Sequence, residues 1–235
     1  IQISEDLSNL KFEQSTHHIL NYEWSKKGKT LRFEVFKKNY ENLILLDQTV
    51  NVNNLTNEGY GFSKGAELFW RLDQTKDGVG KDIWIAYSYL DSKRKFKQYD
   101  SEIIPSFASN HKLTFIYKHG VKLKNGAGFN SSLALTATTG YPYYDPYYDS
   151  LEGKQYESDP YLSFDIGGSY LPEIEDGFMV IFFNLSNPLG YRNSFGYNYI
   201  DYDGTPLVPE EEKLPSSVRS IFIGCFMFFS VDKNK

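Results

Sequence analysis

Hydrophobic and polar residues alternate along most of this chain, in runs that are typical of β-strands with one apolar face. In one run, Leu31, Phe33 and Val35 fall on one face, while Arg32 and Glu34 fall on the other. No window longer than about two helical turns places its apolar residues at the spacing of a helix. The pattern predicts about nine strands, over residues 16–24, 30–40, 60–72, 82–90, 112–119, 128–138, 161–170, 178–184 and 221–229.

The connections between these strands alternate between short and long. The short ones are polar turns at residues 25–28, 77–80, 124–126 and 173–177. The long ones cover residues 41–57, 93–110, 140–160 and 187–217. A water-soluble β-sandwich has no reason to place all its short turns at one end, whereas an outer-membrane barrel has short periplasmic turns and long extracellular loops. The rhythm therefore favours a transmembrane β-barrel with its long segments facing outward.

Strand length and composition agree with this interpretation. Most runs have about 9–12 residues, and a tilted transmembrane strand needs about 9–11. Mean hydropathy is −0.48 and no stretch of about 18 apolar residues exists, which excludes a membrane-spanning helix but not a barrel. Aromatic residues make up 17% of the chain, as girdles at both bilayer interfaces would require. A soluble, sugar-binding sandwich would also be aromatic-rich, so composition alone leaves both folds open.

Candidate chemistry is sparse. The net charge of −5 argues against nucleic acid as the main partner. Cys225 is the only cysteine, so neither a disulfide framework nor a cysteine-rich metal site is predicted. The four histidines lack ligand spacing, and the carboxylates in residues 145–159 match no calcium-loop pattern. Because no hydrolase, metalloprotease or phosphate-binding motif occurs, we expect neither an enzyme nor a bound cofactor or metal.

Several segments carry a resemblance to a known family. They are, in chain order, 31–43 (LRFEVFKKNYENL), 59–67 (GYGFSKGAE), 84–95 (WIAYSYLDSKRK), 105–111 (PSFASNH), 183–187 (FNLSN), and 203–204 (DG) with 219–224 (RSIFIG). Each motif is short, but all stand in the family's order and together they span nearly the whole chain. The chain resembles the C-terminal portion of a TonB-dependent outer-membrane receptor.

The resemblance implies a fold, a location and partners. The fold is an all-β, antiparallel transmembrane barrel, of which residues 1–235 would be one segment: about nine to ten C-terminal strands of a barrel of about 22, with the family's N-terminal plug absent. The location is the bacterial outer membrane. The implied partners are outer-membrane lipid, the plug and N-terminal strands of the receptor, the TonB complex, and a surface lipoprotein. The implied function is TonB-dependent active uptake of an unidentified ligand.

The end of the chain bears on strand number. Bacterial single-chain barrels have even strand counts, so nine strands predict part of a larger barrel, unless residues 1–10 supply a tenth. In the last run, alternate residues ending at Phe229 share one face, as a barrel-assembly signal requires, and residues 230–235 extend beyond it. These alternate residues are Ile221, Ile223, Cys225, Met227 and Phe229.

Tyrosines in the long segments are the predicted ligand contacts. Segment 140–149 (GYPYYDPYYD) places five tyrosines around two prolines, and proline lowers the entropy cost of ordering a loop while tyrosine offers a rigid ring with a hydrogen-bonding tip. An interfacial girdle or ordinary loop packing would also explain them. The predicted ligand-binding residues are Tyr141, Tyr143, Tyr144, Tyr147, Tyr148, Tyr191, Tyr197 and Tyr199.

Two other functions compete with the receptor. One is a small passive channel or adhesin barrel of ten strands, and the other is a soluble β-sandwich that binds a ligand. The basic run 93–97 (KRKFK) could contact anionic lipopolysaccharide or an acidic ligand, although a solvated loop explains it equally well. A sandwich would bury Leu31, Phe33, Leu68, Ile85 and Leu135 in a water-soluble core, whereas a barrel would expose them to lipid.

Overall fold

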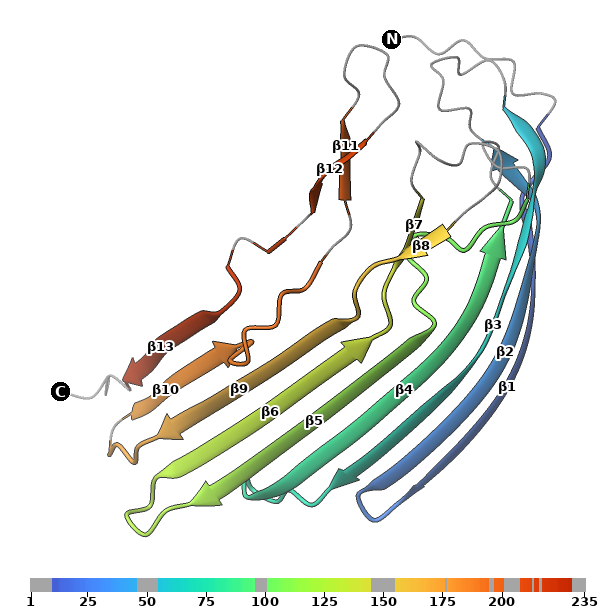
Figure 1. Cartoon of the computed structure of the whole chain (residues 1–235). Coiled ribbons are helices and arrows are strands. Elements are labelled where there is room, and N and C mark those ends of the chain that lie inside the picture. The colour runs from blue at the N-terminus through green and yellow to red at the C-terminus, as the bar shows by residue number, and fades with distance from the viewer. Residues whose placement is uncertain are drawn as a thin grey trace.

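The computed structural model describes residues 10–45, 55–95, 101–144, 155–175, 177–194, 197–200, 208–212, 214–215 and 217–229. All regular structure in these residues is β-strand, and the main sheet contains nine antiparallel strands (Figure 1). Its strands are β1 (Gln14–Lys26), β2 (Lys29–Leu45), β3 (Thr56–Asp73), β4 (Gly80–Arg94), β5 (His111–Lys122), β6 (Gly128–Thr138), β9 (Tyr161–Leu171), β10 (Gly177–Ser186) and β13 (Ser220–Phe229). The predicted all-β fold and strand number are confirmed.

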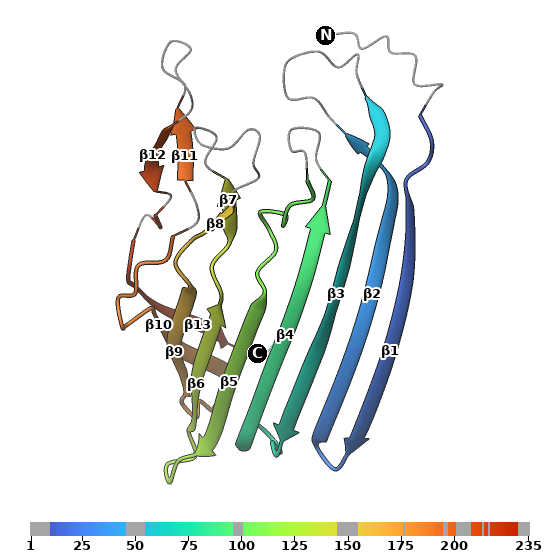
Figure 2. The same cartoon turned by 45° about the vertical axis from the view of Figure 1, so that its right-hand side comes forward.

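The sheet follows chain order from one edge to the other. Its order is β1-β2-β3-β4-β5-β6-β9-β10-β13, and each neighbouring pair is antiparallel. Figures 1 and 2 show a twisted, curved wall, and Figure 1 places β1 and β13 at its opposite margins. In Figure 1 the tight turns lie at the lower end of the wall, and the described parts of the long connections lie at the upper end. The predicted alternation of short and long connections is confirmed.

The tight turns follow from their sequences. Lys27 and Gly28 join β1 to β2 with φ angles of 50° and 73°. Asp77 and Gly78 have φ angles of 51° and 78° between β3 and β4. Two successive positive φ angles are the mark of a type I′ hairpin turn, which matches the right-handed twist of the flanking strands and favours glycine at its second position. Short polar sequences therefore suffice to reverse the chain at this end.

Several strands are longer than predicted. β2 and β3 have 17 and 18 residues, so the predicted loop 41–57 is wrong at both ends. The pairing continues past a register shift at Asn42, whose φ is 56°. Asn57 supports the shift, since its side-chain nitrogen donates hydrogen bonds to the carbonyl oxygens of Lys11 and Asn42. The added residues read ENLIL at 41–45 and TNEG at 56–59, and neither stretch alternates apolar with polar residues, so periodicity does not reveal the extension.

Two small hairpins lie within segments that the sequence analysis treated as loops. One pairs β7 (Pro142–Tyr144) with β8 (Gln155–Glu157), and the other pairs β11 (Tyr197–Ile200) with β12 (Val208–Glu212). Figure 1 places both at the end of the wall opposite to the tight turns. Their strands have three to five residues, which is too short for a periodic signal.

No second layer covers the apolar side of the sheet in the part of the chain that the structure describes. The buried hydrophobic residues there are Leu45, Ile103, Ala108 and Ala127, and all of them lie at strand ends or in connections. In mid-strand, Phe33 and Leu68 are 43% and 41% exposed. A soluble sandwich would bury these side chains against a second sheet, so this fold does not support the sandwich alternative.

Among the described residues, no helix has the length and apolar character needed to cross a membrane.

Candidate functional site

The register of the sheet sorts its side chains into two faces of opposite character. Directly paired residues share a face, so the pairs can be followed from strand to strand. One such row crosses seven strands: Tyr22, Phe33, Leu68, Tyr87, Leu113, Ala137 and Leu162. Its neighbours two residues away include Leu31, Trp70, Ile85, Phe115, Leu135 and Phe164. We call this surface the apolar face.

The other surface, the polar face, carries charged and small polar groups. One row crosses six strands: Asn21, Glu34, Glu67, Ser88, Lys112 and Thr138. A second row nearer the turns reads Asp73, Asp82, Lys118, Ser132, Gly167 and Asn184. The alternation predicted for these strands is therefore confirmed across the sheet. The polar face also carries aromatic rings, among them Phe69 and Trp84 on β3 and β4, and at β10 and β13 Phe182 and Phe222 lie 5.7 Å apart between ring centroids.

An ion network braces the polar face near the turns. The Arg71 guanidinium donates to both carboxylate oxygens of Asp82, at 2.8 and 3.0 Å, and to Asp73 at 3.1 Å. Asp73 and Asp82 are directly paired across β3 and β4, so Arg71 separates two like charges that would otherwise repel. Arg71 and Lys118 also lie 5.9 and 5.4 Å from the Trp84 ring centroid.

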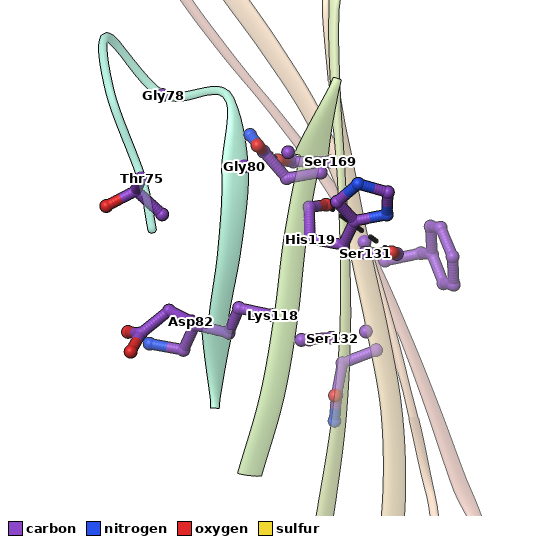
Figure 3. Close-up of a pocket in the computed structure, with 15 residues that line it drawn as sticks. Thr75, Gly78, Gly80, Asp82, Lys118, His119, Ser131, Ser132 and Ser169 are labelled. Carbon is purple, nitrogen blue, oxygen red and sulfur yellow. Dashed lines mark hydrogen bonds between the residues drawn. The ribbon is translucent and has the colours of Figure 1, made fainter. Parts of the chain in front are cut away.

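An open pocket of about 530 Å³ adjoins this network at the turn end (Figure 3). Gly80, Gly120 and Gly167 leave room there, while Lys118 and Asn130 contribute polar groups. Figure 3 shows the glycine-containing 75–80 turn on one side of the hollow and Ser131, Ser132 and Ser169 on the other. A hollow lined by glycines, small polar side chains and the charged Asp82 and Lys118 leaves room for close approach of a peptide backbone or a hydroxyl-rich molecule. Sequence analysis missed it because its residues come from six separate strands or turns.

Of the predicted tyrosines, Tyr141 lies beside the first small hairpin and Tyr143 lies in its strand β7. Tyr143 pairs with Tyr156 across β7 and β8, and their rings stack with centroids 5.6 Å apart. The Tyr141 amide donates to the Ser158 hydroxyl at 2.9 Å, and the Ser158 amide donates back to the Tyr141 carbonyl. Both tyrosine side chains are half-buried. Tyr156 was not among the predicted ligand contacts.

Tyr191 connects the two last long segments. Its hydroxyl donates to the carbonyl oxygen of Pro160 at 3.0 Å. Its backbone is held by Asn187, whose side-chain nitrogen donates to the carbonyl oxygens of both Tyr191 and Val218 at 2.7 Å. Asn187 has a φ of 50°, a conformation that asparagine tolerates better than most residues. Tyr191 thus connects the ends of the two long segments where they meet the sheet, which is a structural role separate from ligand contact.

The remaining predicted tyrosines are only partly placed. Tyr144 lies in β7, and Tyr197 and Tyr199 lie in β11. Tyr147 and Tyr148 fall outside the described residues, as does most of the predicted acidic loop.

Strand alternation divides the predicted basic run. Lys93 pairs with Phe62 on the apolar face, whereas Arg94 pairs with Gly61 on the polar face. The Arg94 guanidinium lies 4.7 Å from the Tyr40 ring centroid and 5.4 Å from that of Phe107, so it holds the 101–110 connection against the end of the sheet. Residues 96–97 fall outside the described residues.

Metal-ligand geometry is not found in the described residues, where no group of three or more His, Cys, Asp or Glu side chains could hold an ion. His17 and His18 point to opposite faces of β1. His111 is engaged by Tyr87, whose hydroxyl lies 2.8 Å from the imidazole Nδ1.

Comparison with known families decides what this wall belongs to. Residues 3–188 match the family model described as "TonB dependent receptor-like, beta-barrel", which covers well over half of the chain. The chain belongs to this family. A search of curated proteins and a search of solved structures each gave no significant match.

Membership in the TonB-dependent receptor family confirms the resemblance seen in the sequence motifs. The family places the chain in a transmembrane β-barrel of the bacterial outer membrane, with a role as a receptor or transporter. Proteins of this family are transporters rather than enzymes, and in general they work with a plug domain and with TonB.

Proposed function

We propose that this chain forms the C-terminal wall of a TonB-dependent receptor that actively takes up a ligand across the outer membrane. In this proposal the apolar face contacts lipid tails, the polar face lines the lumen, and the long segments reach the cell exterior. The tyrosines of these segments contribute to ligand capture, and a surface lipoprotein is a further partner. The separation of the two faces is the observation that carries the proposal.

The height of the apolar face suits an outer membrane. On β2 the charged residues Lys29 and Lys37 bound the apolar residues, and their separation corresponds to about 26 Å along a strand. On β4 the bounds are Lys81 and Asp91, about 33 Å apart along the strand. With a tilt of about 40°, these lengths give roughly 20–25 Å along the barrel axis, close to the apolar band of about 25 Å in outer-membrane barrels.

Strand direction supports a wall that is part of a larger barrel. Nine alternating strands leave β1 and β13 running the same way. If β13 paired directly with β1 of the same chain, the two strands would therefore be parallel. The same holds if β13 paired with β1 of a second copy in the same orientation. An antiparallel barrel needs an odd number of further strands between these edges, and about 13 would complete a barrel of about 22. The sheet in Figures 1 and 2 is an open arc. This shape favours about 13 additional strands over the one additional strand that a ten-stranded channel would need.

Orientation can be tested by labelling on whole cells. Ser106 is exposed in the connection between β4 and β5, and Lys124 is exposed in the tight turn between β5 and β6. In a receptor carrying Cys225→Ala, Ser106→Cys should react with a membrane-impermeant maleimide, and Lys124→Cys should react only after the membrane is opened. Labelling of Lys124→Cys alone on intact cells would reverse the proposed orientation.

Energy dependence separates the receptor from a passive channel. Cells expressing the complete receptor should accumulate radiolabelled candidate ligands above the level of cells lacking it. Removal of TonB should abolish this difference, because active uptake requires energy from the inner membrane. A difference that persists without TonB would favour the passive channel.

A further inference from the structure

Basic residues gather on the apolar face at the edge farthest from the tight turns. Cross-strand pairing places His18, Lys37 and Lys64 side by side on β1, β2 and β3, with Asp91 next on β4. Lys93 lies one row farther along, opposite Phe62. We call His18, Lys37, Lys64 and Lys93 the basic row.

The arrangement is electrostatically unfavourable by itself. Lys37 and Lys64 are directly paired, and like charges in this position destabilise a sheet. Asp91 lies 3.1 Å from Lys64 and balances one charge. Within the described residues no ion pair involves Lys37 or Lys93, and both are exposed. Two exposed lysines without a carboxylate partner leave this level of the face positively charged, and an anion outside the protein would balance that charge.

The position of the row specifies the kind of anion. Immediately below it on the same face lie Leu20, Val35, Ala66 and Tyr89, which begin the apolar band. A lysine just beyond such a band extends its ammonium group to the level of lipid headgroups while its stem covers apolar surface. Phe62 lies one row above Lys64 and Tyr89 lies one row below it, as expected for aromatic residues of an interfacial girdle.

We propose that the basic row binds the headgroup of an outer-leaflet lipid that carries more than one phosphate group, the chemistry of a phosphorylated glycolipid such as lipopolysaccharide. This inference rests on the proposed function for its orientation, since the long segments must face the exterior. Paired lysines on adjacent strands lie about 5 Å apart at their Cβ atoms, so neighbouring ammonium groups can engage one multiply charged headgroup. A lipid with a single phosphate can neutralise only part of the row.

The same face provides a matched control. Lys29 and Lys81 lie at the opposite edge of the apolar band, beside the tight turns. Replacing them removes lysines from the same face but from the other leaflet. The test compares three forms of the complete receptor: the wild type, the variant K37Q/K64Q/K93Q and the control variant K29Q/K81Q. Each is purified in detergent from outer membranes.

The measurement is the amount of lipopolysaccharide that copurifies per mole of receptor. It is followed by the shift in thermal unfolding when purified lipopolysaccharide, phosphatidylglycerol or inorganic phosphate is added to delipidated protein. We expect K37Q/K64Q/K93Q to retain at least threefold less lipopolysaccharide and to lose most of the thermal shift. K29Q/K81Q should behave like the wild type. Phosphatidylglycerol and inorganic phosphate should produce a clearly smaller shift than lipopolysaccharide.

The other outcomes count against the inference in distinguishable ways. Equal retention in all three proteins, or an equal shift with phosphatidylglycerol or inorganic phosphate, would overturn the multiphosphate site and leave the uptake function standing. Loss of retention in K29Q/K81Q alone would overturn the site together with the proposed orientation. If K37Q/K64Q/K93Q fails to assemble, K37Q and K93Q are measured singly, and each should lower retention.

Discussion

At the scale of single residues, aromatic rings cover glycines in the neighbouring strand. Phe36 lies over Gly65, Phe183 over Gly168 and Phe182 over Gly224, and each is a directly paired position. A glycine in a strand interior exposes its backbone, and a ring from the opposite strand replaces the missing side-chain contact. These pairs explain why bulky phenylalanines and glycines alternate across neighbouring strands of this wall.

Gly65→Ala should lower barrel stability by about 1–3 kcal/mol. A Cβ at this position would meet the Tyr89 carbonyl oxygen and would lie 2.8 Å from the Phe36 ring. Gly128→Ala is the matched control, because its nearest atom would be the Leu171 Cβ at 3.5 Å, an ordinary contact. The midpoint of heat-induced unfolding in detergent measures both variants. Equal midpoints would show that the ring does not constrain Gly65.

At the scale of elements, neighbouring strands are joined by more than their backbone ladder. Asn187 and Arg219 belong to the family-like motifs and fix the two ends of the last long segment. Asn187 donates to the Val218 carbonyl oxygen. The Arg219 Nε donates to the Pro188 carbonyl oxygen at 3.1 Å. Asn193 performs a similar role beside β9, where its side chain donates to and accepts from the Leu162 backbone. The long segments are therefore anchored at their roots, which limits the loop conformations available for ligand capture.

Arg71→Gln should destabilise the β3–β4 pair by about 1–3 kcal/mol, since the half-exposed guanidinium is lost and two facing carboxylates remain. Asp82 is only 8% exposed, so its unpaired charge cannot be fully solvated. Adding Asp82→Asn to Arg71→Gln should recover part of the loss, because the repulsion with Asp73 then disappears. Urea unfolding of the four proteins in this cycle gives the coupling. Strictly additive effects would contradict a shared network.

At the scale of the whole molecule, one curved wall separates two environments. In the described residues no second layer covers the apolar face, and the family forms transmembrane barrels. The proposed surroundings of that face are therefore lipid. Each strand then presents alternate residues to hydrocarbon and to the lumen, and the interior strands pair their backbone groups with a neighbour on each side. The two outer edges need partner strands for the same reason.

A charge placed on each face tests this division directly. Leu135 and Thr136 are adjacent in β6 but point to opposite faces. Leu135→Arg should cost about 2–4 kcal/mol near the bilayer midplane and reduce the folded barrel in outer-membrane fractions. Thr136→Arg adds the same charge on the lumen side and should leave assembly largely unchanged. Similar folded amounts for both variants would refute the assignment of the faces.

Alternation and turn chemistry were sufficient to predict the main sheet from local sequence. Side chains in a strand repeat every two residues, so Leu31, Phe33 and Val35 reveal their common face without knowledge of their neighbours. Glycine in the 25–28 and 77–80 segments likewise indicates tight reversal, because few other residues adopt positive φ at low cost. The family motifs depend on the same local patterns.

The register between strands required the folded chain, because local alternation does not determine which residues of different strands become partners. Only the cross-strand pairs reveal that Lys37 meets Lys64, that Arg71 separates Asp73 from Asp82, and that Lys93 and Arg94 face opposite environments. The extension of β2 and the two small hairpins depend on asparagine hydrogen bonds and short pairings without a periodic signal. Period-two patterning is a local property of the backbone, whereas register and charge neighbourhood arise from contacts between distant parts of the chain.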